Sequence, residues 1–338
     1  MEVPEYELPE DAIAQHPAEP RDSSRLLDAT NPSGRLVHRT FRDLPDLLGP
    51  GDVLVINTTR VMPARLRLYK QTGGAAEVLL LEPAGGERDW MALVRPGRRL
   101  QPGTTLHADP SGVPLLRVGE AVVPGDSSDG RRKVHFIEDP GKVFDECGTV
   151  ALPPYIHEPL ADASRYQTVY AETPGSVAAP TAGLHLTSEL LERCRSHGVE
   201  VHAVDLAVGL ATFKPIAVDD AEQHRMHTER YRVPDETMRS CTQARRVVAV
   251  GTTVVRALET AAATGEFEGG SNLYIRGDYP FAMVDVLVTN FHMPRSSLLV
   301  LLESFCGTRW RDIYSEALAN GYRFLSFGDA MIVGRERR

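Results

Sequence analysis

The feature that most constrains the fold is a change of pattern near residue 150. Beyond this point, segments with helical periodicity alternate with short apolar runs that are typical of buried strands. The expected strands are 199–208, 246–251 and 284–288, and the expected helices are 187–198, 235–245, 253–263, one beginning at 298–302, and 310–319. Alternation of strands and helices predicts an α/β domain with a largely parallel sheet.

The segment before residue 150 follows a different pattern. Residues 52–57 are an apolar run that ends in a polar turn, which predicts a buried strand. From 66 to 150, short β-like runs are separated by Gly, Pro and Asp turns, and no helix is expected. We therefore expect residues 1–65 and 151–338 to form the α/β main domain, which carries catalysis, and residues 66–150 to form an inserted β domain.

The charge of the chain limits the kinds of partner it can have. A net charge of −9 argues against a protein that coats nucleic acid, because such binding uses many Lys and Arg contacts to phosphate. It does not exclude an enzyme that holds one RNA hairpin with a local basic patch. Arg95, Arg98 and Arg99 form one such cluster and residues 131–133 another, although either cluster taken alone is better explained as a solvated charged loop.

Compartment and metal content can also be anticipated. No apolar run reaches the roughly 20 residues that a membrane span needs, and the acidic N-terminus is unlike a signal peptide, so we expect a cytoplasmic protein without membrane contact. The four cysteines are widely spaced and form no metal-binding pair. His224 and His227 share a helical spacing, but only Glu229 lies near as a third ligand, so no metal is expected. The sequence does not define the oligomeric state.

Ligands of open α/β sheets bind at the carboxyl ends of strands, and two loops there are rich in functional groups. The loop after strand 52–57 carries Arg60, which suits phosphate or carboxylate, with a plain surface arginine as the alternative. The small-residue loop 174–185 contains Thr181 and Gly183 and ends at His185, beside a helix start. Small residues allow a ligand to approach the backbone, and an imidazole can move a proton near neutral pH.

Two further junctions follow later strands. Gly251, Thr252 and Thr253 form a strand–helix junction suited to an anionic or ribose-like group, without the glycine spacing of a dinucleotide site or a P-loop. On the same helix, Arg256 and Glu259 are spaced for a simple ion pair. The fourth junction contains an amide, a ring, an imidazole and a guanidinium that suit a purine, with core packing as the alternative for the ring: Asn290, Phe291, His292 and Arg295.

At this point the residues match a known family. Matching stretches lie at 6–9, 13–17, 20–26, 59–66, 152–156, 166–170, 175–185, 222–227, 251–253, 256–259, 289–296 and 328–331. In these motifs and their order the chain resembles the S-adenosylmethionine:tRNA ribosyltransferase-isomerases of queuosine biosynthesis. The resemblance implies an α/β main domain with an inserted antiparallel β-barrel. It also implies two partners, S-adenosylmethionine and the tRNA anticodon arm, and no cofactor, because S-adenosylmethionine is consumed as a substrate.

The implied reaction gives the loops their expected roles. The ribosyl group of S-adenosylmethionine moves to the 7-aminomethyl-7-deazaguanine wobble base of tRNA and is isomerised to epoxyqueuosine, while methionine and adenine leave. A base must remove a proton beside the sulfonium, and we expect His185 or His292 to act as base or acid. Asn290 and Phe291 are expected to hold a purine, residues 251–253 the ribose or methionine end, and Arg60 and Arg295 a phosphate or carboxylate.

At three loop positions the chain has a residue that differs from the one usual in this family. Thr58 stands where an Asp is common, Ala207 where a His is usual, and Ala211 where a Gly is usual. These differences leave an alternative open, namely a paralogue that uses the same donor on another deazapurine or a small-molecule acceptor. A catalytically silent tRNA-binding relative is a further alternative.

Overall fold

The computed structural model describes residues 2–31, 33–121, 130–209, 216, 221, 226 and 228–336. The chain divides into two compact units, which are considered separately below. The sheet unit comprises Met1–Arg60, Pro153–Thr173 and Ala179–Arg338, and the barrel unit comprises Val61–Leu152 and Pro174–Ala178. Among the described helices, we find none with the length and apolar character that crossing a membrane requires.

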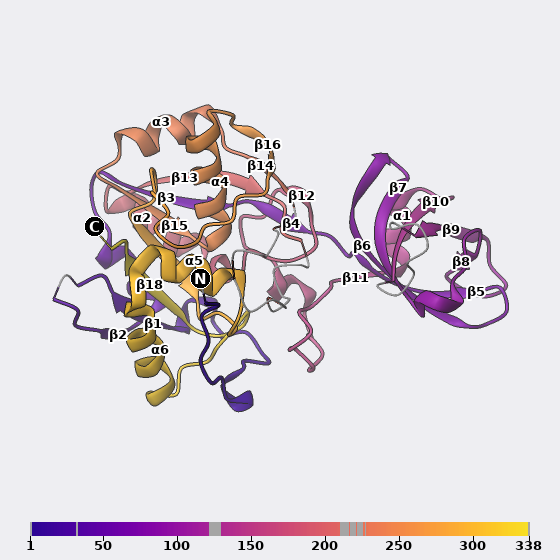
Figure 1. The fold of residues 1–338 in the computed structure, drawn as a ribbon, viewed down its shortest axis with the longest axis horizontal. Helices are drawn as coiled ribbons and strands as arrows, with labels where there is room; N and C mark the ends of the chain where they lie inside the picture. Colours follow the sequence, from indigo (N-terminus) through magenta and orange to yellow (C-terminus); the bar gives the residue numbers. More distant parts are fainter. Residues whose placement is uncertain are drawn as a thin grey trace. The chain divides into compact units, whose positions relative to one another are not determined.

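The sheet unit is built on a nine-stranded mixed sheet with the order β16-β14-β13-β3-β15-β17-β18-β1-β2 (Figure 1). Neighbouring strands β13, β3, β15 and β17 are parallel, whereas β14, β16, β18 and β2 each pair antiparallel with a neighbour. The strand bounds are β1 Arg25–Ala29, β2 Val37–Thr40, β3 Asp52–Asn57, β13 Glu200–Leu206, β14 Glu229–Arg232, β15 Arg246–Val250, β16 Glu268–Ser271, β17 Val286–Asn290 and β18 Ala330–Gly334. The sheet is thus parallel at its centre and antiparallel towards both edges.

This strand order determines where the functional loops meet. The four central parallel strands all end at one edge of the sheet, at Leu206, Asn57, Val250 and Asn290. Strand β18 runs antiparallel to β17, with Ala330 opposite Asn290, so β18 and its parallel neighbour β1 begin at that same edge. The loops after β3, β15 and β17 and the loops before β1 and β18 therefore gather there.

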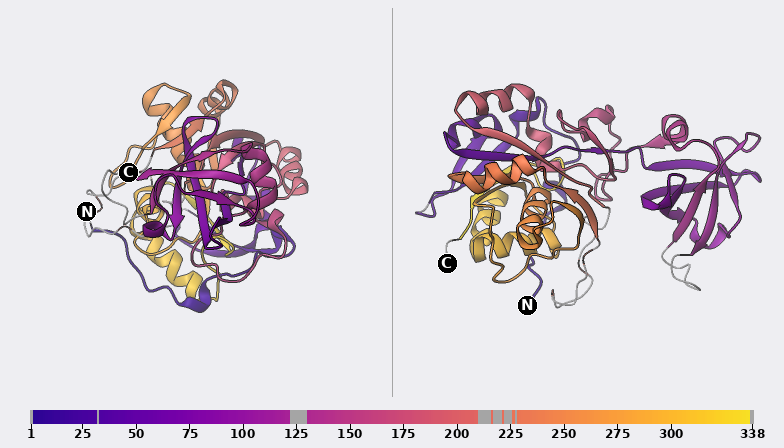
Figure 2. Two further views of the ribbon diagram at one scale, coloured as in Figure 1. Left: turned by 90° about the vertical axis from the view of Figure 1, so that its right-hand side faces the viewer. Right: turned by 90° about the horizontal axis from the view of Figure 1, so that it is seen from above.

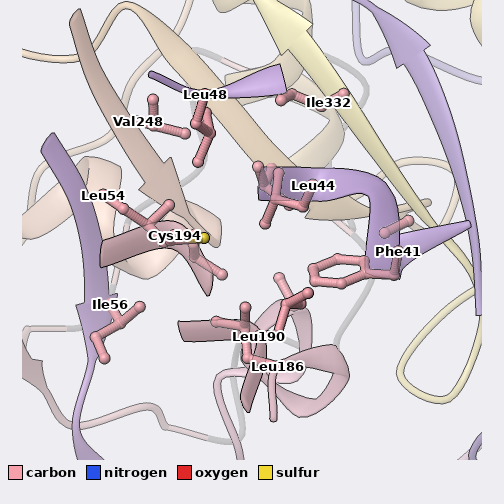
Figure 3. Close-up of a cluster of buried hydrophobic side chains, with 14 of the residues drawn as sticks. Phe41, Leu44, Leu48, Leu54, Ile56, Leu186, Leu190, Cys194, Val248 and Ile332 are labelled. Carbon is pink, nitrogen blue, oxygen red and sulfur yellow. The ribbon is translucent and has the colours of Figure 1, made fainter. Parts of the chain in front are cut away.

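Helices cover both faces of the sheet. Figure 2 shows α2 on one side of the sheet and the orange and yellow helices α4, α5 and α6 on the other. The helix bounds are α2 Ser188–Ser196, α3 Asp235–Gln243, α4 Thr252–Thr264, α5 Ser297–Cys306 and α6 Trp310–Ala319. Leu190 and Cys194 of α2 pack with Leu54 and Ile56 of β3 and with Phe41 of the 3-10 helix Phe41–Leu47 (Figure 3). Burial of this apolar surface holds α2 against the sheet.

The start and stop of α2 follow from its sequence. The side chain of Thr187 accepts a hydrogen bond from the backbone N–H of Leu190, at 3.1 Å, which satisfies one of the free donors of the first turn. Gly198 follows the helix with a φ of 78°, a conformation that glycine adopts without strain. The helix therefore begins and ends where its capping residues require.

The barrel unit is a closed antiparallel barrel. Strands β5, β6, β7, β10, β9 and β8 pair in that order, and a further β5–β8 pairing closes the ring, with β11 added to β5. The strand bounds are β5 Arg65–Lys70, β6 Ala75–Gly86, β7 Asp89–Arg95, β8 Thr105–His107, β9 Pro114–Ala121, β10 Arg131–Phe136 and β11 Gly148–Thr149. Strands β4 (Thr59–Val61) and β12 (Thr173–Ser176) form a separate two-stranded sheet. The α/β fold class with an antiparallel barrel is confirmed.

One expectation for this segment is wrong. Residues Pro140–Cys147 form helix α1, although no helix was expected between 66 and 150. The side chain of Asp139 accepts a hydrogen bond from the N–H of Lys142, at 3.2 Å, and Pro140 occupies the first helical position. An Asp-Pro-Gly start resembles a turn in sequence, but Asp is also a good helix cap and proline is tolerated in the first turn.

Candidate active site

A chain of hydrogen bonds links three segments at the carboxyl edge of the central strands. Thr181 donates through Oγ1 to Oδ1 of Asn290 at 2.9 Å. Nδ2 of Asn290 lies 3.1 Å from Nε2 of His185, and Nδ1 of His185 lies 2.8 Å from Oγ of Ser24. These residues come from the 3-10 helix Thr181–His185, the end of β17 and the residue before β1. The chain topology therefore brings together groups that are more than 100 residues apart.

The direction of these bonds fixes the tautomer of His185. Because Oδ1 of Asn290 accepts from Thr181, the amide NH2 group of Asn290 faces Nε2 of His185 and donates to it. Nε2 is then the acceptor, and the ring proton sits on Nδ1, where it donates to Ser24. Both ring nitrogens of His185 are therefore engaged inside the protein.

His185 is buried and uncharged. Its side chain is packed beside the ring of Phe41, with centroids 4.8 Å apart. Burial, with a smaller contribution from the positive charge of Arg323, lowers the pKa of His185 to about 3. The imidazole is therefore neutral at physiological pH, and the Thr181–Asn290–His185–Ser24 chain is an uncharged one.

His292 has a different environment. Burial lowers the pKa of His292 to about 3, so this ring is neutral as well. Nε2 of His292 lies 3.1 Å from Oγ1 of Thr289, while Nδ1 has no hydrogen-bond partner among the described residues. The backbone is fixed on both sides, because Tyr6 donates to the carbonyl at 2.6 Å and the N–H donates to the hydroxyl of Tyr314 at 2.7 Å. One nitrogen of a rigidly held imidazole is thus left without an internal partner.

A small pocket is lined by His292 and by Thr181 and Asn290 of the hydrogen-bonded chain. It has a volume of about 40 Å³, and its polar wall is formed by Tyr155, Thr181, Asn290, His292, Ser296 and Ser326. A volume of this size accepts a water molecule but not a nucleoside. Binding of a larger ligand here requires the walls of the pocket to move apart.

The ring of Phe291 is buried in the core and is not exposed for stacking in this pocket. The ring is fully buried and stacks on Phe324 at a centroid distance of 4.7 Å, with Tyr314 and Tyr322 edge-on. Core packing, the alternative left open by the sequence, is what the structure shows for the ring. Phe291 still lines the pocket, so a ligand there meets this residue without stacking on an exposed ring.

The junction between β15 and α4 is tied to the end of β3. Gly251 has a φ of 94°, which favours glycine, and its N–H donates to the carbonyl of Val288 at 2.8 Å. Nδ2 of Asn57 donates to the hydroxyl of Thr253 at 3.3 Å, and Thr252 is buried. The N–H of Gly251 is thus used internally. The first turn of α4 is held at the same edge as Asn290.

Gly183 is required by packing. A Cβ atom at this position would collide with the hydroxyl of Tyr170 and approach Thr168 to 3.0 Å. Any larger residue would therefore displace the turn that carries Thr181 and His185.

The two expected arginines lie apart from the hydrogen-bonded chain. Arg60 is exposed, and its guanidinium donates to the carbonyl of Ala171 at 2.8 Å. Arg295 lies 3.5 Å from a carboxylate oxygen of Glu5, and its N–H donates to the carbonyl of Pro4 at 3.0 Å. Within the described segments, neither arginine is hydrogen bonded to Thr181, Asn290 or His185. Arg295 holds the N-terminal segment in place.

The simple ion pair between Arg256 and Glu259 is absent. Arg256 instead forms a buried ion pair with Glu229, which also accepts the N–H of Gly209 at 3.0 Å. Glu259 accepts backbone N–H groups of residues 282, 283 and 284 at 2.8 to 3.0 Å. The carboxylate of Glu229 is therefore already bonded to Arg256 and to the N–H of Gly209.

His224 and His227 lie outside the described residues, and the described part of the chain contains no cluster of His, Cys, Asp and Glu that suits a metal.

Sequence reasoning did not select Ser24 or Tyr155. Ser24 bonds to His185, and Tyr155 lines the pocket and lies 2.7 Å from the hydroxyl of Ser326. Both residues are in stretches that match the family, 20–26 and 152–156, so a signal was present. Their roles depend on long-range contacts that local patterns do not reveal.

Comparisons with known proteins agree over the full chain. The sequence profile of the family described as queuosine biosynthesis protein matches residues 2–333. An S-adenosylmethionine:tRNA ribosyltransferase-isomerase of Rubrobacter xylanophilus is 50% identical over 332 residues, covering 97% of this chain and 96% of the relative. A protein of the same name from Symbiobacterium thermophilum is 48% identical over 342 residues, covering 97% and 98%.

A solved structure is similar as well. The crystal structure of S-adenosylmethionine tRNA ribosyltransferase from Thermotoga maritima has 37% sequence identity and a TM-score of 0.54, and the match covers 97% of this chain and 99% of that one. The profile, the relatives and this structure each match nearly the whole sequence. The chain therefore belongs to the queuosine biosynthesis protein family.

Proposed function

We propose that this chain is an S-adenosylmethionine:tRNA ribosyltransferase-isomerase. It moves the ribosyl group of S-adenosylmethionine to the 7-aminomethyl-7-deazaguanine wobble base of tRNA and isomerises it to epoxyqueuosine, releasing methionine and adenine. The observation that carries this proposal is the 50% identity over 97% of the chain to a relative of that name. No observation favours another acceptor, and the departures at Thr58, Ala207 and Ala211 do not disturb the match over the whole chain.

The partners follow from this reaction. S-adenosylmethionine is consumed as a substrate, so the proposal includes no separate cofactor, and the tRNA is held by its anticodon arm. We place the protein in the cytoplasm, where tRNA is modified.

The two histidines are proposed to have different tasks. A proton must leave the carbon next to the sulfonium, and a neutral imidazole has the lone pair that accepts it. His292 is the better candidate for this step because Nδ1 has no partner among the described residues and the ring lines the pocket. The burial that lowers its pKa to about 3 makes the neutral ring a weaker base than an ordinary imidazole and the protonated ring a stronger acid, so the ring favours giving the proton up again. We propose that it then passes the proton to the departing adenine.

His185 is proposed to position Asn290. Its Nε2 accepts the amide N–H of Asn290, and its Nδ1 donates to Ser24, so proton transfer to substrate would require breaking one of these bonds. Asn290, Phe291 and Thr181 are proposed to hold the adenine, whose leaving is assisted by hydrogen bonds. This proposal is supported by the position of all three residues in the wall of the same pocket.

The remaining candidates are proposed to bind the rest of the substrates. Gly183 allows the close packing of the 181–185 turn. Residues 251–253 lie at the start of α4, where a helix N-terminus favours the carboxylate of the methionine part or the ribose hydroxyls. Arg60 is exposed and suits a phosphate of the tRNA, and Arg295 suits a carboxylate after release of Glu5.

One incubation tests the function. The protein is mixed with S-adenosylmethionine and tRNA that carries the aminomethyl deazaguanine, and free adenine and the mass of the tRNA are measured. We expect adenine release together with a mass gain of the tRNA. Adenine release only with the free base would contradict the proposed acceptor, and tRNA binding without adenine release would contradict the activity.

A further inference from the structure

One face of the barrel unit has a cationic hollow that the reaction described above does not use. In the ladder of β5, β6 and β7, Arg67 is paired with Glu77, and Glu77 is paired with Arg95. Adjacent strands are about 4.8 Å apart, so the two arginines are separated by about 10 Å across the ladder. Both side chains are exposed, because alternate residues of β5 and β7 point away from the barrel interior.

The hollow is large and contains an exposed aromatic ring. Its volume is about 620 Å³, and its wall includes Arg67, Tyr69, Ala75, Glu77, Arg95 and Pro96. Tyr69 lies two residues after Arg67 on the same face of β5 and is 41% exposed, which is unusual for a tyrosine in this protein. The small Ala75 stands opposite Tyr69 on β6 and leaves one side of the ring open.

More positive charge lies next to this hollow. Arg98 and Arg99 are exposed on the short turn Gly97–Arg99 that follows β7. Nη2 of the buried Arg132 donates to the carbonyl of Gly97 at 3.2 Å, which fixes the turn against β10. The turn is therefore held on the barrel by a hydrogen bond from a buried side chain.

The charge of this face differs from that of the whole chain. Residues 61–152 contain as many basic as acidic residues, whereas the complete chain has a net charge of −9. The acid in the hollow, Glu77, is already 4.0 Å from Nε of Arg65, which offsets its charge. Arg67 and Arg95 have no ion-pair partner among the described residues, so they are available to an anionic partner.

We propose that this hollow binds a single-stranded segment of the tRNA substrate, with phosphates on Arg67 and Arg95 and a base stacked on Tyr69. The inference rests on the proposed function, which supplies tRNA as the partner. Arginine guanidinium groups make paired hydrogen bonds to phosphate, and exposed aromatic rings stack on unpaired bases. Arg98 and Arg99, on the turn next to the hollow, add positive charge for neighbouring phosphates of the same RNA strand.

Binding of substrate tRNA by fluorescence anisotropy, in the absence of S-adenosylmethionine, tests this surface. The variant Arg67→Gln/Arg95→Gln is compared with Arg117→Gln, which removes an exposed arginine from β9 outside the hollow. We expect Kd to rise at least about tenfold for the double variant and to stay unchanged for Arg117→Gln. The slope of log Kd against log salt is expected to fall by about 1.4 in the double variant, or about 0.7 for each lost phosphate contact.

Tyr69 gives an independent test, because it carries no charge. Tyr69→Ala is expected to raise Kd about tenfold without changing the salt slope, and Tyr69→Phe is expected to bind as the unchanged protein does. All four positions are exposed, so thermal melting of each variant should match the parent protein.

The outcomes separate this inference from the proposed function. If the double variant and Tyr69→Ala bind tRNA as tightly as the parent, or if Arg117→Gln weakens binding equally, the surface is wrong. A parent protein that binds no tRNA overturns the surface and the function together. If the variants weaken binding as expected but the parent releases no adenine, the surface stands and the proposed reaction fails.

Discussion

His185 and His292 lie at the same edge of one sheet, are both buried and are both neutral, yet their surroundings differ. Each nitrogen of His185 is hydrogen bonded, one to Asn290 and one to Ser24. His292 has a partner at Nε2, the hydroxyl of Thr289, and none at Nδ1 among the described residues. The difference shows that burial and a lowered pKa alone do not identify a proton-transfer residue. The unused hydrogen-bonding capacity of the ring is the more informative feature.

The largest expected effect is at His292. Replacement by Gln should lower the rate of adenine release about 10³-fold, because a glutamine cannot carry the proton. Adenine release at saturating substrates is the measurement. Thr289→Val is the matched control, since it removes the hydroxyl beside Nε2 but keeps the imidazole, and it should cost about tenfold or less. Equal losses in the two variants would show that the neighbourhood of His292, rather than its ring, matters.

His185 should respond differently to the same change. A glutamine at position 185 can still accept the amide N–H of Asn290, so His185→Gln should retain activity to within about tenfold of the parent. His185→Ala should lose about 10²-fold, because Asn290 is then left without this partner and a cavity forms. Comparing the adenine-release rates of the two variants gives the answer. If Gln is as inactive as Ala, His185 transfers a proton itself and the proposed division of roles fails.

Ser24 should show a smaller effect. Ser24→Ala removes the acceptor of the Nδ1–H of His185 and should destabilise the fold by about 1–2 kcal/mol, with only a few-fold loss of activity. Urea unfolding and adenine release are measured together, with Ser23→Ala as the control because the hydroxyl of Ser23 donates to the nearby carbonyl of Pro20 and, among the described residues, to no group of the site. A loss of activity without a loss of stability would argue that Ser24 acts on the substrate directly.

The pH dependence of stability should show the least difference between the two histidines. Both pKa values are lowered to about 3 in the folded protein, against about 6.5 in an unfolded chain. Their contribution to stability is therefore complete above about pH 6.5 and is lost as the pH falls towards 3, because the unfolded state binds more protons in that range. Urea unfolding between pH 7 and 5 should become easier with falling pH.

Single replacements check this expectation. His185→Gln and His292→Gln should each flatten the pH slope by about one proton, and by similar amounts. His16→Gln, which removes an exposed histidine instead of a buried one, is the control for the substitution itself. A large inequality between the two buried positions would contradict the similar burial described above.

Much of the fold could be predicted from local patterns. The strand expected at 52–57 is β3, and the cap at Thr187 and the stop at Gly198 define α2. Capping, periodicity and turn signals act within a few residues, so the sequence displays them directly. Helix α1 was missed because its Asp-Pro-Gly start is compatible with a turn as well as with a cap. The domain boundaries expected at residues 66 and 150 stay a prediction.

The candidate site was less predictable for a physical reason. That Asn290 and His185 lie together follows from strand order, but the partner of each ring nitrogen depends on contacts between residues more than 100 positions apart. The same is true of Arg256, whose partner is Glu229 rather than the nearby Glu259. Side-chain pairing at the edge of a sheet is set by tertiary packing, and a single sequence shows only which groups are available.

The most direct test of the division between the two histidines is exchange of hydrogen at the carbon next to the sulfonium. The reaction is run in D₂O with substrate tRNA, and deuterium is measured by mass spectrometry in recovered S-adenosylmethionine and in the modified tRNA. Proton removal is taken to be reversible, and the protonated ring of His292 exchanges its proton with solvent before adenine leaves, so a reversed transfer returns deuterium to the carbon. The account therefore predicts deuterium with the parent protein and with His185→Gln, and none with His292→Gln. Deuterium at the parental level with His292→Gln, or its complete loss with His185→Gln, would contradict it.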